Sequence, residues 1–111
     1  MQAQLNNLGA ARSIGMFTIS ITPAATAAAS AVEQAFTVTA GTNSSTLPAG
    51  VVLDATDLVV VRGPASGNNV AIGTARVNSS NQVVVTFINP TAGSLTHASG
   101  TFIVFVARPI K

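Results

Sequence analysis

The chain has 111 residues, about the size of one domain, and 48% of them are hydrophobic while only 7% are charged. Because typical domains are about 25% charged and disordered chains combine low hydrophobicity with high net charge, a net charge of +2 here excludes intrinsic disorder. No apolar run approaches the roughly 18 residues of a membrane span, so we expect a soluble, unprocessed protein with no membrane partner. No nucleic-acid footprint is predicted, because the cations are scattered along the sequence as Arg12, Arg62, Arg76, Arg108 and Lys111.

The first 13 residues are polar and rich in asparagine, with almost no apolar periodicity. We therefore expect residues 1–13 to form an extended N-terminal arm and residues 14–111 to form one domain. An arm with so few apolar side chains needs a surface to lie on. We expect a neighbouring chain to supply that surface, with Leu5, Leu8 and Arg12 of the arm in the contact.

Alternation of apolar and polar residues predicts the next strands. Phe17, Ile19 and Ile21 alternate with polar residues until Pro23, which is typical of a half-buried strand. The alanine-rich residues 24–30 lack caps and a polar face, so we favour a loop there over a helical turn. Alternation then resumes over residues 36–40, which predicts a second strand of the same kind.

The second half of the chain has the spacing of a sandwich. Residues 70–77 read as a strand that changes face at Gly73, which predicts a β-bulge. Turn residues separate the strands at intervals of about 8 to 12 residues, in segments 63–69, 78–81 and 90–94. The pattern predicts an all-β fold: a single antiparallel β-sandwich or jelly-roll-like domain.

Three further strands, residues 58–61, 83–88 and 102–107, are apolar at nearly every position. One face of an antiparallel sheet normally meets the core and the other meets water, so a second set of apolar side chains is unexplained. These strands are either central and covered by loops and the alanine-rich segment, or exposed at a subunit interface. The interface hypothesis places there Val59, Val61, Val84, Ile88, Ile103 and Phe105.

Few residues are capable of chemistry. Asp54 and Asp57 could pair for hydrolysis or a hard cation, but their spacing is more typical of a turn that leads into the next strand. His97 lies in a glycine-bounded loop, where an exposed or locally bonded imidazole is the ordinary case. No serine lies in a nucleophile-elbow pattern, and the absence of Trp and Tyr disfavours a sugar or single-strand site. We expect no enzyme and assign no catalytic, cofactor or metal residue.

The order of motifs over residues 32–108 resembles a recurrent family of small tailed-bacteriophage virion proteins. The family pattern runs from a Thr-rich strand through a Val-rich strand and a Pro-Gly loop to an Ala-Arg-Val strand, an Asn-Pro-Thr-Ala-Gly turn and a last strand. The matching residues are Phe36-Thr37-Val38-Thr39, Leu58-Val59-Val60-Val61, Gly63-Pro64, Ala75-Arg76-Val77, Asn89-Pro90-Thr91-Ala92-Gly93 and Phe102-Ile103-Val104-Phe105. The loop at Arg62 departs from the usual family sequence.

The resemblance implies a virion β-sandwich, made in the host cytoplasm, that decorates the outer capsid surface as a cement protein. Its implied partners are the major capsid protein and two further copies of itself in a homotrimer. A different class remains open: a receptor- or glycan-binding domain of a fibre or spike. That domain would use two loops, residues 63–69 and 90–99.

Overall fold

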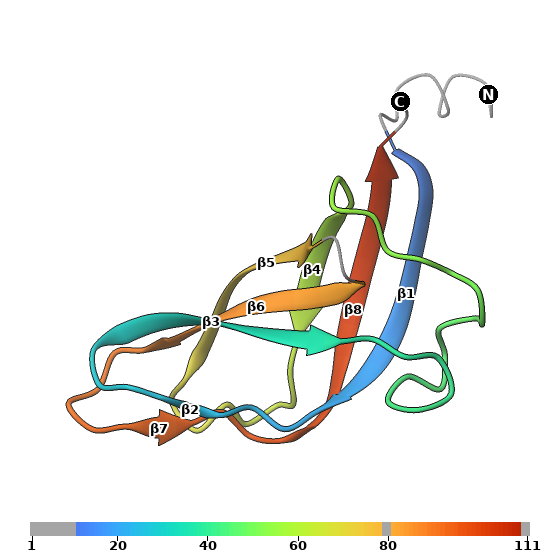
Figure 1. Ribbon diagram of the computed structural model, residues 1–111. Helices are drawn as coiled ribbons and strands as arrows, with labels where there is room; N and C mark the ends of the chain where they lie inside the picture. The colour runs from blue at the N-terminus through green and yellow to red at the C-terminus, as the bar shows by residue number, and fades with distance from the viewer. Residues whose placement is uncertain (1–10, 79–80, 110–111) are drawn as a thin grey trace.

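The computed structural model describes residues 11–78 and 81–109. Within these ranges the chain forms strands and no helix, which confirms the predicted all-β class. Figure 1 shows the strands in chain order. They are β1 (Ala11–Ile21), β2 (Ala25–Thr26), β3 (Ser30–Thr37), β4 (Leu58–Arg62), β5 (Ala71–Asn78), β6 (Gln82–Asn89), β7 (Leu95–Thr96) and β8 (Gly100–Pro109).

The six longer strands form two antiparallel sheets. One sheet has the order β1-β8-β4 and the other has the order β3-β6-β5, while β2 and β7 form a small ribbon. In Figure 1 the two sheets cross one another, and the ribbon lies at the end remote from the start of β1 and the end of β8. The arrangement is the expected β-sandwich-like fold, and the more specific jelly-roll topology stays a prediction.

The core lies between the inner faces of the two sheets. β1 turns Phe17, Ile19 and Ile21 inward, as its alternation predicts, because successive side chains of a strand point to opposite faces. The central strands contribute Phe102 from β8 and Phe87 from β6, both fully buried. Full burial of each such side chain stabilises the fold by about 1.5 to 3 kcal/mol, and the same cluster includes Val59, Val61, Val77, Val83, Val85 and Val104.

β1 begins earlier than the alternation indicates, which corrects the predicted boundary of the arm. Ala11 pairs with Pro109 and Ser13 pairs with Arg108, so residues 11–13 belong to the domain. Sequence periodicity misses this stretch because its pairing partner is at the other end of the chain. The remainder of the predicted arm, residues 1–10, lies outside the described residues.

The predicted bulge in β5 is confirmed. Pairing between β5 and β6 shifts register between Ile72 and Ala75, the segment that contains Gly73. A Cβ atom on Gly73 would lie 3.0 Å from Cδ1 of Ile88, so the close approach of β6 also favours glycine.

β3 starts at Ser30, ahead of the predicted alternation, because β6 offers pairing partners along its whole length. The strand predicted over residues 36–40 is wrong beyond Thr37, because the Asn43 side chain accepts from the N–H of Thr39 and donates to the carbonyl oxygen of Thr37.

The Asn89 side chain organises the Asn-Pro-Thr-Ala-Gly turn. Asn89 is 1% exposed, and its Nδ2 donates to the carbonyl oxygens of Thr26 and Gly93 at 2.9 and 2.8 Å. Its Oδ1 accepts from the backbone N–H and the hydroxyl of Thr91 at 3.0 and 2.7 Å. One amide therefore closes the turn and joins it to β2, which explains why asparagine stands at the start of this turn motif.

Candidate interaction surface

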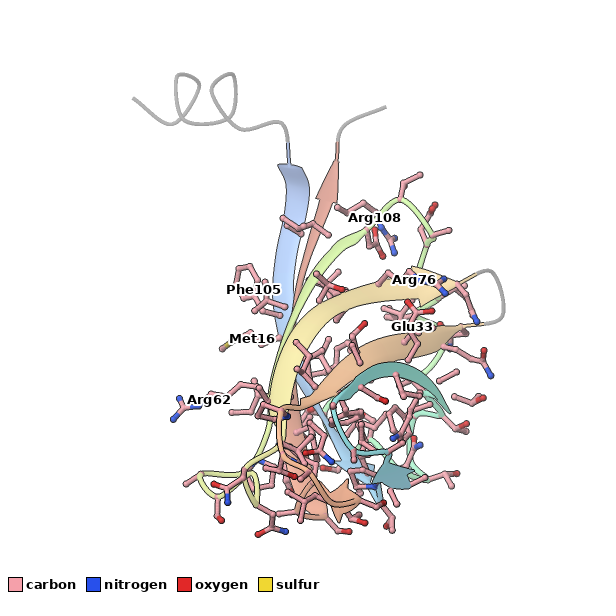
Figure 2. All side chains as sticks on the ribbon, turned by 90° about the vertical axis from the view of Figure 1, so that its left-hand side faces the viewer. Met16, Glu33, Arg62, Arg76, Phe105 and Arg108 are labelled. Carbon is pink, nitrogen blue, oxygen red and sulfur yellow. The ribbon has the colours of Figure 1, made fainter. Side chains whose placement is uncertain are left out.

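The sheet β1-β8-β4 carries exposed apolar side chains on the face that points away from the core. The strand register places Met16, Phe105 and Val60 in one row across the three strands. Ile103 and Leu58 lie in the neighbouring rows on the same face. We call the set of these five residues the outer face. In Figure 2 the labelled Met16 and Phe105 both project from this side of the molecule.

The outer face is exposed in the single chain. Exposure is 67% for Met16, 63% for Leu58 and 58% for Val60, and it is 39% and 37% for Ile103 and Phe105. Together they expose apolar area on the order of several hundred Å², a patch size that commonly marks a protein-interaction site. The loops and the alanine-rich segment therefore do not cover this face, which disfavours the first of the two explanations for the doubly apolar strands.

Arg62 ends the apolar surface on β4. Opposite Ile103 in the register, Arg62 is exposed and projects on the same side as Met16 in Figure 2. Among the described side chains it takes part in no ion pair, whereas Arg76 and Arg108 each bind a carboxylate. The outer face thus combines apolar side chains with one unneutralised cation at its rim.

The structure confirms exposure for only part of the predicted interface. Ile103 and Phe105 belong to the outer face, and Ile88 is 37% exposed on the other sheet. The prediction was wrong for Val59 and Val61, because these side chains are 5% and 9% exposed and point into the core. Leu5 and Leu8 lie outside the described residues, and for Arg12 only the backbone in β1 is described.

The predicted exposure of Val84 at an interface is also wrong. Val84 points away from the core, but it is only 4% exposed. Its neighbours across the sheet are Arg76 on β5 and Ala35 on β3. Arg76 reaches over β6 and donates from Nε and Nη2 to the Glu33 carboxylate on β3, both at 3.0 Å. The ion pair therefore spans the central strand, and the arginine side chain shields Val84 from solvent.

The missed residues of the outer face are Met16, Leu58 and Val60. For β4 the sequence had no signal, because four consecutive apolar residues do not show which pair faces the core. Pairing with β8 determines which two residues face the core. Val59 and Val61 lie opposite Val106 and Val104, which point inward. For Met16 the sequence did carry a signal: Met16 is an apolar residue on the same face of the strand as polar Thr18, where the alternation predicts a polar residue.

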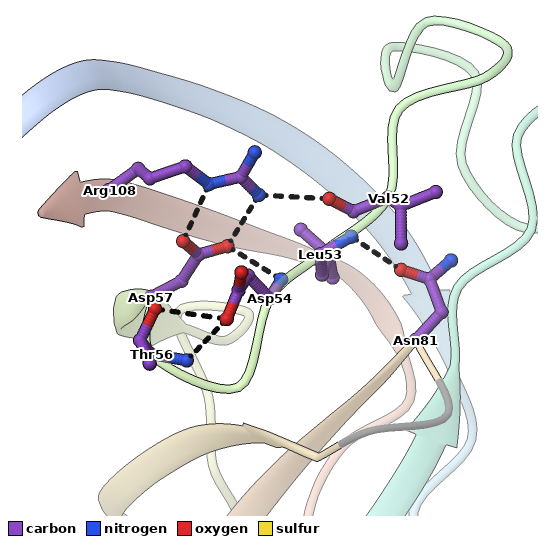
Figure 3. Close-up of polar contacts among 7 residues, drawn as sticks. All are labelled: Val52, Leu53, Asp54, Thr56, Asp57, Asn81 and Arg108. Atoms are coloured by element: carbon purple, nitrogen blue, oxygen red, sulfur yellow. Dashed lines mark hydrogen bonds and ion pairs between the residues drawn. The ribbon is translucent and has the colours of Figure 1, made fainter. Parts of the chain in front are cut away.

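The acidic pair Asp54 and Asp57 forms a structural clamp, drawn in Figure 3. Arg108 donates from Nε and Nη2 to the two oxygens of Asp57, both at 2.8 Å, and from Nη2 to the Val52 carbonyl at 2.8 Å. The backbone N–H of Asp54 also donates to Asp57 at 2.9 Å, and Asp54 accepts two bonds from Thr56. The turn prediction is confirmed, and the carboxylates are engaged in holding β8 to the loop before β4.

Hydrogen bonds from Arg108 hold the pKa of Asp57 below its ordinary value, against the opposing effect of burial. Asp57 therefore stays ionised near neutral pH, and a carboxylate bound by a bidentate arginine is poorly placed to act as a general acid. In the part of the chain that the structure describes, no group of three or more His, Cys, Asp or Glu side chains could hold a metal ion.

His97 is a buried residue of the core edge. It is 4% exposed, its Nδ1 lies 2.9 Å from the Ala98 carbonyl oxygen, and its ring packs against Phe87 and Phe102. The local bond was anticipated, but the burial was not. It depends on Gly63, where a Cβ atom would lie 2.8 Å from Cε1 of the imidazole.

The two loops of the alternative binding hypothesis lie close together. Asn68 Nδ2 donates to the Thr96 carbonyl at 3.1 Å, which joins the loop after β4 to the loop around β7. A hollow of about 370 Å³ opens beside them, lined in part by Pro64, Val70 and His97. This end of the molecule is a second, more polar candidate site.

Comparison with known proteins finds no matching family model, curated protein or solved structure. In the described residues there is no helix long and apolar enough to cross a membrane.

Proposed function

We propose that this chain is a non-enzymatic structural protein that binds the outer surface of a virion capsid and stabilises the shell by bridging its subunits. The major capsid protein is the proposed partner, and the proposed active form is a homotrimer. One observation carries the proposal: a globular chain leaves five large apolar side chains exposed on one sheet face. The motif order of the small phage virion proteins supports the choice of assembly.

Charge favours a different protein over a second copy as the occupant of the outer face. The chain has three acidic residues, and Glu33 and Asp57 are already in ion pairs with Arg76 and Arg108. Asp54 accepts hydrogen bonds from Thr56 in its turn. A second copy thus offers poor electrostatic complementarity to Arg62, whereas a shell surface with an apolar patch and a nearby carboxylate would match both features.

The size of the outer face explains why several linked copies are needed. At about 25 cal/mol per Å², a few hundred Å² of apolar surface on each partner contributes a free energy in the range of several to about 15 kcal/mol. Association costs about 4 to 15 kcal/mol in lost motional freedom, so one contact alone binds weakly. Simultaneous contacts by the copies of a trimer raise the effective affinity, and many trimers on one shell multiply the stabilisation.

The proposal is tested with capsids assembled in the absence of this protein. Purified protein is mixed with these capsids, and the bound fraction is measured by co-sedimentation. Val60→Asp removes an exposed apolar contact, and we expect affinity to fall about tenfold or more. Val52→Asp is the matched control, because Val52 is 66% exposed in the loop before β4, outside the outer face, and should be neutral. Equal binding by all three proteins, or none by the wild type, would contradict the proposal.

The joined loops at the His97 end support a second candidate, a receptor- or glycan-binding domain. The hollow between residues 63–67 and His97, together with the hydrogen bond from Asn68 to Thr96, supports this candidate. Saturable binding to host-cell surface sugars that is lost in Asn68→Ala would favour this candidate, provided that Val60→Asp leaves it unchanged.

A further inference from the structure

Within the described residues, one edge of β1 is only partly covered. β8 pairs with one side of β1, and on the other side the loop before β4 caps two positions. The N–H of Thr18 donates to Oγ1 of Thr46, and the N–H of Ser20 donates to the Asn43 carbonyl, both at 2.7 Å. Hydrogen-bonding direction alternates along a strand, so the N–H and C=O of Met16 point to this same edge. No loop group within the described residues bonds to Met16 there.

An apolar groove lies beside the uncapped part of the edge. Its volume is about 180 Å³, and Arg108 contributes one charged residue to an otherwise apolar lining that includes Phe17, Leu47, Val51, Leu53 and Val106. The groove opens on the core side of the sheet, because Phe17 points inward, whereas Met16 points to the outer face. An added strand would therefore meet apolar surface on both of its faces.

The sequence before Ala11 has the side-chain pattern that such a strand needs. Leu5 and Leu8 are three residues apart, so in an extended strand they point to opposite faces. One leucine would enter the groove and the other would join the outer face. Residues 1–10 could extend over about 33 Å, enough to reach an adjoining copy.

Register disfavours binding within the same chain. A two-residue turn at Gly9 and Ala10 would pair Leu8 with Ala11, and it would then place Gln4 and Gln2 opposite the groove positions Gly15 and Phe17. Glutamine side chains match an apolar groove poorly. A turn one residue later would use Ala10 and Ala11, neither of which suits the positive φ of tight hairpin turns.

We propose that residues 4–8 of a neighbouring copy add to the free edge of β1 and place a leucine in this groove. Each copy gives one segment and receives one, and such a head-to-tail contact forms a ring when the rotation between copies closes, which for three copies is the proposed trimer. The inference deepens the proposed function, since it rests on the proposed homotrimer and supplies its contact between copies.

Disulfide trapping tests the contact without background from native thiols, because the sequence has no cysteine. Leu5→Cys protein and, separately, Leu8→Cys protein are mixed with Val51→Cys protein under mild oxidation, and the cross-linked peptides are identified by mass spectrometry. We expect the cross-link from one of these two leucine positions to Val51 to exceed by at least about tenfold the cross-link from the same position to Val32→Cys, since Val32 lies on the other sheet. Equal yields for the two partners would overturn the proposal.

Two further measurements separate the possible occupants. A single chain that carries Val51→Cys and the cysteine at the leucine position that cross-links should not close on itself at high dilution, and an internal disulfide there would overturn the contact between copies. Deletion of residues 1–8 should convert a trimer to a folded monomer in light scattering, whereas an unchanged trimer would refute the exchange. Capsid binding by Val60→Asp is independent of both results, so loss of the arm contact alone would leave the capsid proposal standing.

Discussion

Two bidentate arginine–carboxylate pairs in this chain differ in burial, and they should differ in energetic weight. The Asp57 side chain is 0% exposed in its pair with Arg108, whereas the Glu33 and Arg76 side chains are 50% and 57% exposed. Removal of one partner of a buried pair costs about 3 to 5 kcal/mol. Arg108 is 36% exposed and can be rehydrated, so we expect Asp57→Ala to cost less than that range, about 2 to 3 kcal/mol.

The assay is urea unfolding followed by circular dichroism, with thermal melts as a second measurement. A loss of 2 to 3 kcal/mol corresponds to a fall in Tm of roughly 10 to 20 °C for a domain of this size. Glu33→Ala is the matched control, and we expect its midpoint to stay close to wild type because its pair is solvent-exposed. If the two variants were equally stable, burial of Asp57 would not explain a larger contribution of its ion pair to the free energy of unfolding.

Further predictions concern pH and two close-packed positions. Because the pKa of Asp57 is lowered in the folded state, its contribution is present above about pH 4 and is lost as pH falls further; urea midpoints at pH 6 and pH 3 should therefore differ less in Asp57→Asn than in wild type. Gly63→Ala should destabilise by about 1 to 3 kcal/mol in thermal melts because its Cβ would meet His97 at 2.8 Å, while Gly93→Ala, with open space around it, should be neutral. Asn89→Asp keeps the shape but removes two donated bonds, so a loss of about 2 kcal/mol or more is expected in urea unfolding, and wild-type stability would contradict the role given to this amide.

Where apolar and polar residues alternate along the sequence, the alternation was sufficient to predict which face of a strand points inward. It correctly gave the inward face of β1 from Phe17 to Ile21, and the break in pattern at Gly73 located the bulge. It failed in β4, where every residue from Leu58 to Val61 is apolar and only pairing with β8 selects the outward pair. Register between distant strands is a tertiary property that local sequence does not encode.

The candidate site was predictable in part for the same reason. Ile103 and Phe105 were assigned to an interface from the excess of apolar residues, and both are exposed. Burial of His97 was not predictable, because the space for its ring depends on Gly63, 34 positions earlier in the chain. Coverage of Val84 likewise depends on an ion pair between β3 and β5.

Heat stability of the shell tests the central claim most directly. Capsids that lack this protein are incubated with wild-type protein or with Val60→Asp, and rupture is followed by the access of a fluorescent dye to packaged DNA. We expect wild-type protein to raise the rupture temperature and Val60→Asp to leave it close to that of bare capsids. Equal protection by both proteins, or no protection by the wild type, would contradict stabilisation of a shell through the outer face.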